Sequence, residues 1–375
     1  MIRVLALVTD AYGGRGGIAQ AARDVIGALA ADPTVEAIDV LPRYTAEPPS
    51  GLPAKVHQRA AIGARIVYAT ASLAAARSSR PEVVLCNHLY MAPLARLAAR
   101  ITGAKLVLQL HGIEVWPQPT KGQRQALEAA DLLLCVSRDT RARAIAHADL
   151  APERAVVLNN TVDPRFAPGN RAAARAKFGL DADFALLAVG RLDARERYKG
   201  HDRVIAALPR LIGPGGCKPV FLVAGDGDDR ARLEAAAASS GVRDRIRFLG
   251  QVPSADLPDL YRAADLFVLP STCEGFGIVY LEAMASGTPA LGLAVGGVFD
   301  ALGDGELGRL VDPMADLSST LQTAISAPRP DPHVLAASVA ARFGKEAFQR
   351  RLALLLNLTA NGNSIMGQVH RVTVL

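Results

Sequence analysis

Short apolar runs alternate with amphipathic stretches along most of the chain. In the first half, apolar runs with the length of buried strands fall at residues 3–9, 37–41, 83–86, 106–110, 132–136 and 155–158. Segments with apolar residues at helical spacing lie between most of them, for example at 18–30 and 92–101. Strands that alternate with helices favour a parallel sheet with helices on both faces. The sequence therefore predicts an α/β fold.

The same alternation begins again in the second half of the chain. Turn-forming residues at 159–169 interrupt the pattern, and apolar runs then recur at 185–189, 220–224, 246–249, 266–269 and 289–292. We therefore predict two similarly built domains, residues 1–165 and 166–345. An amphipathic helix at 346–360 and a tail at 361–375 follow the second domain.

The segment from Glu274 to Glu282 combines a short glycine-containing loop with the beginning of a helix. The apolar run before it is typical of a buried strand, and residues 278–286 have helical spacing. This order places Glu274 and free backbone N–H groups at a helix N-terminus, where anions bind. Carboxylates accept hydrogen bonds from sugar hydroxyls, whereas N–H groups donate to phosphates. The segment therefore indicates a phosphorylated sugar as the ligand.

A glycine-rich loop follows the first predicted strand. Gly13, Gly14, Gly16 and Gly17 lie between that strand and the helix expected from Ile18. Glycine admits positive φ angles and close approach of a ligand, and the start of a helix directs N–H groups at the loop. The spacing departs from the G-x-G-x-x-G pattern of dinucleotide sites. We interpret the loop as a phosphate or ligand loop, with a plain tight turn as the alternative.

Two cationic residues and a histidine also follow predicted strands. Arg191 follows the first strand of the second half, and Lys199 lies just before the next helix. Two cations at the carboxyl edge of a parallel sheet can hold a diphosphate, although surface charge is the simpler explanation. His111 occupies the equivalent position after the run at 106–110, where a functional and a structural role are both open.

Composition and charge narrow the classes of protein. No run of about 18 uncharged apolar residues occurs, so a membrane span is not expected. The four cysteines are scattered, without disulfide or metal spacing, and no export signal is recognisable, which predicts a cytoplasmic protein. The net charge of +6 comes mostly from the first 165 residues. Anionic lipid, a lipid-linked diphosphate, nucleic acid or plain solubility would each account for it.

Taken in order, these segments resemble the family 4 (group 1) glycosyltransferases of the GT-B type. The matching positions run from the glycine loop to about residue 312, and the pair Glu274 and Glu282 carries the most specific part. The matches are Gly13–Gly17, His111-Gly112, Gly190-Arg191-Leu192, Lys199-Gly200, Ala224–Gly227, Phe248–Gly250, Ala264-Asp265 and Glu274–Gly287. The resemblance implies two Rossmann-like domains, with the donor held mostly by the C-terminal domain.

The resemblance also implies roles for the charged residues of the second domain. Arg191 and Lys199 would neutralise the diphosphate of the donor. Glu274 would contact the hydroxyls of the transferred sugar, and Glu282 would hold the ribose hydroxyls. In this chain the spacing from Arg191 to Lys199 is longer than is common in the family, so a short insertion separates the two cations.

Backbone groups complete the implied donor site. By the resemblance, those of Phe276, Gly277 and Ile278 would meet the sugar and the phosphate, and those near Val252 would meet the base. Such enzymes are generally retaining and need neither a metal ion nor a cofactor. No Asp-x-Asp pair stands at a strand end as an obvious metal site, and the nearest candidate is the acidic turn at residues 226–229.

The first domain would contribute fewer groups. The resemblance implies that Gly16 and Gly17 approach the donor phosphate and that His111 lies beside the sugar. It also implies that the helix at 346–360 packs back onto the first domain.

We therefore expect a retaining, metal-independent glycosyltransferase that moves a hexose from GDP-mannose or a UDP-hexose to a lipid-linked or polysaccharide acceptor. A sugar-nucleotide epimerase of the same fold and a non-catalytic nucleotide-sugar-binding module remain as alternatives. Basic residues spread over 55–80 could bring the protein to an anionic membrane at the inner face of the cell membrane, and a solvated helix is the alternative. Nucleic acid is not an expected partner, because no basic face carries aromatic residues.

Overall fold

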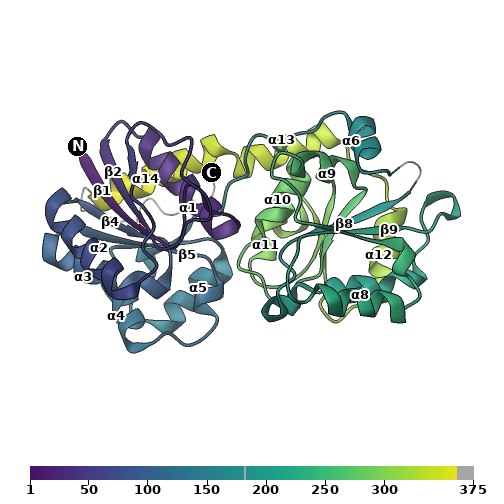
Figure 1. The fold of residues 1–375 in the computed structure, drawn as a ribbon, viewed down its shortest axis with the longest axis horizontal. Coiled ribbons are helices and arrows are strands. Elements are labelled where there is room, and N and C mark those ends of the chain that lie inside the picture. Colours follow the sequence, from purple (N-terminus) through teal and green to yellow (C-terminus); the bar gives the residue numbers. More distant parts are fainter. Residues whose placement is uncertain (181–182, 361–375) are drawn as a thin grey trace. The chain divides into compact units, whose positions relative to one another are not determined.

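The computed structural model describes residues 1–180 and 183–360, and the tail assigned to 361–375 lies outside the described residues. The chain forms two compact units (Figure 1). Of the described residues, one unit holds Met1–Thr161 and Lys345–Ala360, and the other holds Val162–Gly344. The division therefore falls at Thr161, slightly before the expected boundary at residue 165. The backbone N–H of Val162 donates to the carbonyl of Phe343 at 3.0 Å, so the chain enters and leaves the second unit side by side.

The first unit is built on a seven-stranded parallel sheet of order β3-β2-β1-β4-β5-β6-β7. Its strands are β1 Ile2–Val8, β2 Val35–Pro42, β3 Val56–Gln58, β4 Val83–Cys86, β5 Lys105–Leu110, β6 Leu132–Cys135 and β7 Ala155–Val157. Its helices are α1 Gly17–Ala31, α2 Arg65–Ser79, α3 Ala92–Thr102, α4 Lys121–Ala129, α5 Arg138–His147 and α14 Lys345–Ala360.

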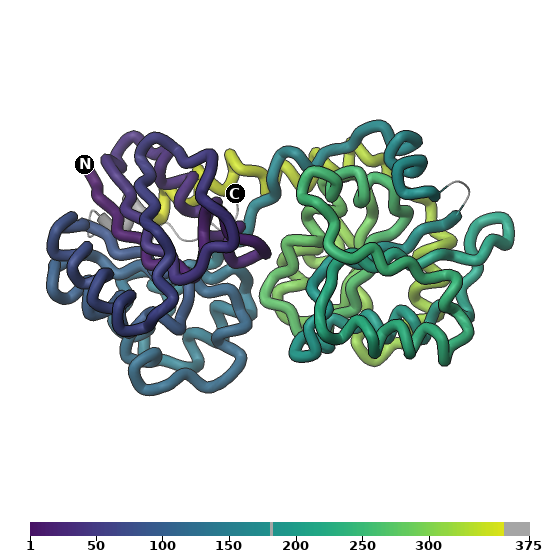
Figure 2. Tube along the Cα trace, in the orientation of Figure 1, coloured from purple at the N-terminus to yellow at the C-terminus, as the bar shows by residue number. Residues whose placement is uncertain are grey.

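Helices cover both faces of this sheet, and alternate residues of β1 show why. Val4 and Ala6 pack into a cluster with α1, whereas Leu5 and Leu7 pack into another with α2 to α5. Successive side chains of a strand point to opposite faces, so a strand buried on both sides must be apolar throughout. Helix α14 packs against α1 (Figure 2). Its residues Phe348, Leu352 and Leu355 belong to the α1 cluster.

The second unit repeats the design with a six-stranded parallel sheet of order β10-β9-β8-β11-β12-β13. Its strands are β8 Ala185–Val189, β9 Val220–Ala224, β10 Ile246–Gly250, β11 Leu266–Leu269, β12 Ala290–Leu293 and β13 Arg309–Val311. Its helices are α6 Arg171–Lys177, α7 His201–Ala207, α8 Arg230–Ser239, α9 Leu257–Ala263, α10 Ile278–Ala285, α11 Val298–Ala301, α12 Leu317–Ser326 and α13 Pro332–Phe343. The expected α/β class with two Rossmann-like halves is confirmed.

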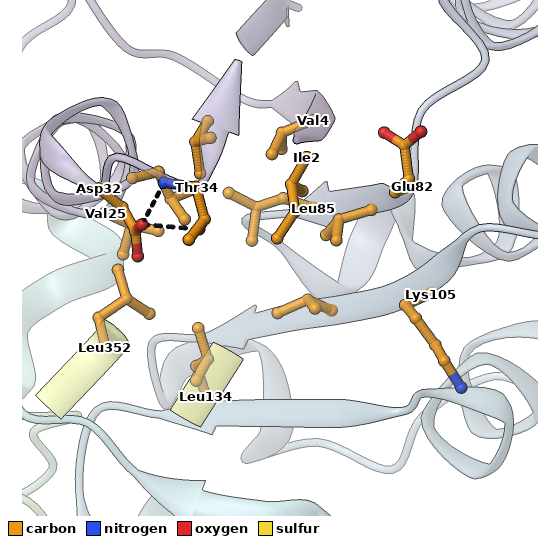
Figure 3. Close-up of a pocket in the computed structure, with 14 residues that line it drawn as sticks. Ile2, Val4, Val25, Asp32, Thr34, Glu82, Leu85, Lys105, Leu134 and Leu352 are labelled. Carbon is orange, nitrogen blue, oxygen red and sulfur yellow. Dashed lines mark hydrogen bonds between the residues drawn. The ribbon is translucent and has the colours of Figure 1, made fainter. Parts of the chain in front are cut away.

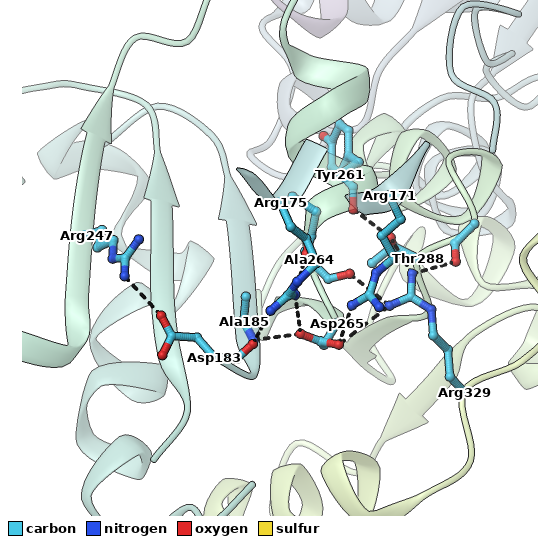
Figure 4. A network of polar contacts seen from close by, with 12 residues as sticks. Arg171, Arg175, Asp183, Ala185, Arg247, Tyr261, Ala264, Asp265, Thr288 and Arg329 are labelled. Carbon is cyan, nitrogen blue, oxygen red and sulfur yellow. Dashed lines mark hydrogen bonds and ion pairs between the residues drawn. The ribbon is translucent and has the colours of Figure 1, made fainter. Parts of the chain in front are cut away.

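Asp265, just before β11, forms hydrogen bonds and ion pairs with residues of β8 and α6 (Figure 4). Its carboxylate accepts hydrogen bonds from the backbone N–H of Ala185 at 2.9 Å and from Arg175 at 3.1 Å, and it pairs with Arg171 at 2.5 Å. The neighbouring Arg329 donates to the carbonyl of Ala264 at 3.0 Å. These bonds lie at the amino ends of β8 and β11, so Asp265 stabilises the fold at the edge remote from the strands' carboxyl ends.

Candidate active site

Four loops meet at the carboxyl edge of the second sheet. They follow β8, β9, β11 and β12, which are adjacent strands of a parallel sheet. The carboxyl ends of parallel strands lie at one edge, where α/β folds place their ligands. The sheet therefore brings Arg191, which follows β8, and Glu274, which follows β11, to the same edge.

The loop that carries Glu274 is held by the turn after β12. The backbone N–H of Gly297 donates to the carbonyl of Glu274 at 2.8 Å. A Cβ atom at Gly297 would lie 2.0 Å from the carbonyl oxygen of Gly275, so no other residue allows this approach. Helix α10 begins at Ile278, and its N-cap residue, Gly277, has no side chain to cap the helix. The loop is therefore fixed while the start of α10 keeps N–H groups for a ligand.

The carboxyl group of Glu274 lies in a partly dry environment with two charged neighbours. Burial raises its pKa above the ordinary value, the Lys199 ammonium lowers it, and the Glu196 carboxylate raises it. The backbone N–H groups of Gly275 and Phe276 also donate to this carboxylate and lower the pKa. The geometry agrees with this influence, because the N–H of Thr272, in the loop of Glu274, donates at 2.8 Å to the carbonyl of Tyr198, next to Lys199.

Glu196 lies between the two cations that the sequence singled out. Its Oε2 atom accepts from the Nζ of Lys199 at 2.5 Å, and its Oε1 atom pairs with the guanidinium of Arg191. The Lys199 side chain is 14% exposed and that of Glu196 9%, whereas that of Arg191 is 72% exposed. The Nζ atom of Lys199 lies just after the end of β8, 3.3 Å from the point that a Cβ atom at Gly190 would occupy. Sequence reasoning placed both cations but missed Glu196, which lies in the insertion between them.

Glu282 lies on α10 and has a partner that sequence reasoning also missed. The hydroxyl of Tyr261, in α9, donates to its Oε2 atom at 2.7 Å. Burial raises the pKa of Glu282, while the bond from Tyr261 and the charge of Arg165 lower it. Tyr261 is fully buried, so its ring fixes the position of the hydroxyl and hence of the carboxylate.

Val252 and the backbone of the α10 loop lie beside the same edge. Val252 follows β10 and is half-buried. Phe276 is buried, whereas Gly277 and Ile278 are partly exposed at the start of α10. The structure thus gathers the expected C-terminal residues at one end of the second sheet.

The remaining expected residues form a separate group in the first unit. Gly16 and Gly17 are exposed after β1, and Gly16 has a φ of 88° with nothing within 4 Å of its Cβ position. Arg23 shapes the loop by donating to the carbonyls of Ala11 at 2.7 Å and Gly14 at 2.9 Å. The backbone at Gly16 is therefore open to an approaching ligand.

His111 follows β5, and a second histidine accompanies it. Its Nε2 atom lies 2.7 Å from the carbonyl oxygen of Asn87, and its backbone N–H donates to Glu114 at 2.9 Å. Burial lowers the pKa of His111, which favours the neutral ring at pH 7. The ring of His88 lies 6.4 Å away, centroid to centroid. Sequence reasoning missed His88, although it follows β4 as His111 follows β5.

Two family models match consecutive parts of this chain. The model described as Glycosyl transferases group 1 matches residues 170–348, and that described as Glycosyltransferase Family 4 matches residues 15–166. Together they account for most of the chain, and the gap between them, residues 167–169, lies a few residues after the division between the two units. The chain belongs to the group 1, or family 4, glycosyltransferases.

Curated relatives of this family 4 chain carry one recurrent name. This chain is 36% identical over 196 residues to the D-inositol 3-phosphate glycosyltransferase of Mycobacteroides abscessus, and the aligned region covers 51% of this chain and 43% of the relative. It is 36% identical over 225 residues to the protein of that name from Rhodococcus jostii, which covers 56% of this chain and 49% of the relative. The chain therefore spans about half the length of these relatives.

Solved structures show the same GT-B fold. The sucrose-phosphate synthase of Thermosynechococcus elongatus matches with a TM-score of 0.77 at 21% identity, covering 97% of this chain and 100% of that one. Anabaena Alr3699/HepE in complex with UDP-glucose matches with a TM-score of 0.75 at 21% identity, covering 95% and 100%. Within residues 1–180 and 183–360, no helix of the family 4 chain is long and apolar enough to cross a membrane.

The acidic turn after β9 is engaged by neighbouring groups. Asp229 pairs with Arg197 at 2.8 Å and with Arg232 at 2.6 Å, and Asp228 accepts from the backbone N–H of Ala194 at 2.7 Å. In the part of the chain that the structure describes, no group of three or more acidic, His or Cys side chains is arranged to hold a metal ion. The turn therefore has a structural explanation.

A cavity in the first unit lies away from these residues (Figure 3). It has a volume of about 210 Å³ and lies among β1, β4, α1 and α14. Most of its lining is apolar, with Val4, Val25, Leu85 and Leu352 among the residues. None of the expected site residues lines it. It is therefore distinct from the candidate site.

Proposed function

We propose that this protein is a glycosyltransferase that moves a hexosyl group from a nucleoside diphosphate sugar to a saccharide or lipid-linked acceptor, with retention and without a metal ion. The observation that carries the proposal is that the segment ending at Lys199 is joined to the loop of Glu274 at one sheet edge, by the 2.8 Å bond from the N–H of Thr272 to the carbonyl of Tyr198. A cation for phosphate and a carboxylate for sugar hydroxyls within electrostatic reach of each other fit the two halves of such a donor.

The donor extends across the loops of the second unit. Arg191 and Lys199 pair with the diphosphate, and Glu274 accepts from the sugar hydroxyls. Glu282, held by Tyr261, accepts from the two ribose hydroxyls, and the base lies by Val252 after β10. The N–H groups at the start of α10 add donors for the phosphate that carries the sugar.

The reaction breaks the bond between the anomeric carbon and the phosphate oxygen. Negative charge grows on the departing diphosphate, and cations and a helix N-terminus already directed at it stabilise that charge. The acceptor oxygen forms its bond to the anomeric carbon on the face that the diphosphate leaves. Attack on that face retains the configuration. A phosphate oxygen of the donor takes the acceptor's proton, so the protons balance.

The proposed acceptors, a saccharide or a lipid-linked saccharide, are suggested by the names of the relatives. The curated relatives are named for D-inositol 3-phosphate, and a solved relative is a lipopolysaccharide outer core galactosyltransferase. Peripheral contact with an anionic membrane rests on the first turn of α2. There Ile66 is 80% exposed and Val67 54% exposed, next to the basic side chain of Arg65.

Donor turnover tests the proposal. The protein is incubated in EDTA with GDP-mannose, UDP-glucose or UDP-galactose, with inositol 3-phosphate or a lipid-linked saccharide as acceptor. We expect release of the nucleoside diphosphate together with a glycosylated acceptor of retained configuration. Donor turnover without an acceptor product would favour the epimerase, and binding without turnover would favour a non-catalytic module. An Arg195→Ala variant serves as control, because this exposed residue lies near the cations but pairs with Asp193.

A further inference from the structure

The insertion between Arg191 and Lys199 supplies an anion to the site that is proposed to bind one. Each carboxylate oxygen of Glu196 bonds a different cation, Lys199 at 2.5 Å and Arg191 by the other oxygen. The carboxylate thus occupies the position between two positive charges that a phosphate group of the donor would take. A buried carboxylate bonded to both members of a cationic pair reduces their net charge from two to one.

We propose that Glu196 is a specificity-determining residue that excludes singly charged anions from the diphosphate site and gives way to the donor. The inference rests on the proposed function. A chloride or acetate ion that replaced the carboxylate would exchange one negative charge for another and gain no electrostatic energy. The diphosphate of a nucleotide sugar carries two negative charges and forms pairs with both cations, so its binding is favoured over the internal contact.

The backbone around Lys199 explains how the cation keeps its place when Glu196 leaves. The N–H of Thr272 donates to the carbonyl of Tyr198 at 2.8 Å, which joins the end of the insertion to the loop after β11. The Lys199 ammonium also interacts with Glu274. Lys199 therefore has a fixed backbone and lies within the electrostatic range of a second carboxylate, whereas the middle of the insertion faces solvent at Arg195, with 87% of its side chain exposed.

The charge of Glu196 also reaches the residues proposed to bind the sugar. Burial is the main cause of the raised pKa of both Glu274 and Tyr198, and the charge of Glu196 raises both further. Replacement of the carboxylate by a donor phosphate keeps a negative charge at this point. Glu274 therefore has a negative charge near this point in both the empty and the donor-bound forms.

Calorimetric titration of the nucleoside diphosphate tests the inference with a Glu196→Gln variant. The amide keeps the shape and removes the charge, so we expect the nucleoside diphosphate to bind about fivefold tighter at low salt. We also expect the affinity of the variant to fall more steeply with added potassium chloride, because chloride then competes for two uncovered cations. A Glu82→Gln variant, which breaks an ion pair with Arg3 in the first unit, is the control and should bind like wild type.

The outcomes separate the inference from the proposed function. Equal or weaker binding by Glu196→Gln, with an unchanged salt dependence, overturns the inference, because a residue that only orients the cations would lower affinity when removed. No binding by wild type overturns the proposed function and the inference with it. If Glu196→Gln unfolds at the temperature of the titration, Glu196→Asp replaces it. The shorter carboxylate cannot span both cations, so tighter binding than wild type is again expected, and binding like wild type would overturn the inference.

Discussion

The hydroxyl of Tyr261 donates a hydrogen bond to the Oε2 atom of Glu282 across 2.7 Å, from α9 to α10. Because Tyr261 is fully buried, this bond holds one carboxylate oxygen in a fixed direction and leaves the other for a ligand. The remaining oxygen has two lone pairs, so both hydroxyls of a vicinal diol such as that of ribose can donate to it. In the proposed donor site, the pair therefore links the packing of α9 to binding of the nucleoside.

A Tyr261→Phe variant should bind the donor about tenfold less tightly with little change in kcat, which corresponds to the loss of one hydrogen bond to a charged group. The same bond lowers the pKa of Glu282, so its removal raises that pKa further. The rise in KM on acidification should consequently begin at a higher pH in the variant. Measurement of KM for the donor against pH checks both effects.

Tyr68→Phe is the matched control for this prediction. Tyr68 is a buried tyrosine of the first unit whose hydroxyl donates to the carbonyl of Leu41 at 2.8 Å. Its substitution removes a comparable bond without touching the donor site. An equal change of KM in the two variants would contradict the role given to Tyr261.

Glu274→Gln should stabilise the empty protein at neutral pH while it lowers activity. Burial raises the pKa of Glu274 in the folded state above the unfolded value of about 4.3. A carboxyl group of this kind destabilises the fold when ionised, and the cost disappears as the pH falls through the folded and then the unfolded pKa. The melting temperature of the variant should therefore exceed that of wild type at pH 7 to 8, and the two should converge near pH 4.

Melting curves of both proteins between pH 4 and pH 8 test this prediction, with donor turnover measured alongside. A variant that is less stable than wild type at pH 8 would show that the two N–H groups and Lys199 outweigh the burial of Glu274. In that case the ionised carboxylate stabilises the fold, and the prediction that Glu274 lowers stability is wrong.

Gly297→Ala should displace the loop that carries Glu274. The added methyl group would lie 2.0 Å from the carbonyl oxygen of Gly275, so the backbone must move. We expect the free energy of unfolding to fall by about 1–3 kcal/mol from overpacking. We expect donor affinity to fall by a much larger proportion than the free energy of unfolding. Gly27→Ala is the control, because nothing lies within 4 Å of its Cβ position on α1. Donor affinity that survives in Gly297→Ala would argue against the loop as the sugar site.

Asp265→Ala should lower stability without a direct effect on donor binding. Its carboxylate, 17% exposed, joins Arg171, Arg175 and the start of β8 at the edge opposite the candidate site. Removal of one member of a buried pair costs about 3–5 kcal/mol because the partner charges lose their counter-ion. Chemical denaturation measures the loss, and the affinity of the folded fraction for the nucleoside diphosphate should match that of wild type.

The sequence predicted the central strands well because each is a continuous apolar run buried on both faces. The edge strands β3 and β13 were missed, because Val56-His57-Gln58 and Arg309-Leu310-Val311 include polar residues and show no continuous apolar run, unlike the equally short β7. Arg191, Lys199, Glu274 and Glu282 could be chosen from their positions after strands and in the helix that follows. Their partners could not, because those contacts depend on the folded chain.

Glu196 and Tyr261 illustrate that limit. Glu196 lies in a charged insertion where each side chain has several candidate partners, so nothing in the order of residues selects it over its neighbours. Tyr261 has the spacing of a core residue and is one, and its hydroxyl reaches Glu282 only because α9 packs against α10. Pairings across elements of this kind require tertiary structure.

Binding of GDP and UDP to wild type and to Lys199→Ala, measured by calorimetry in EDTA, tests the central claim most directly. Wild type should bind one of the two nucleotides, and Lys199→Ala should bind it at least about thirtyfold more weakly because a charged pair with the diphosphate is lost. Arg195→Ala, in the same insertion, should bind like wild type. Equal affinity of wild type and Lys199→Ala would contradict the assignment of the diphosphate site and the account built on it.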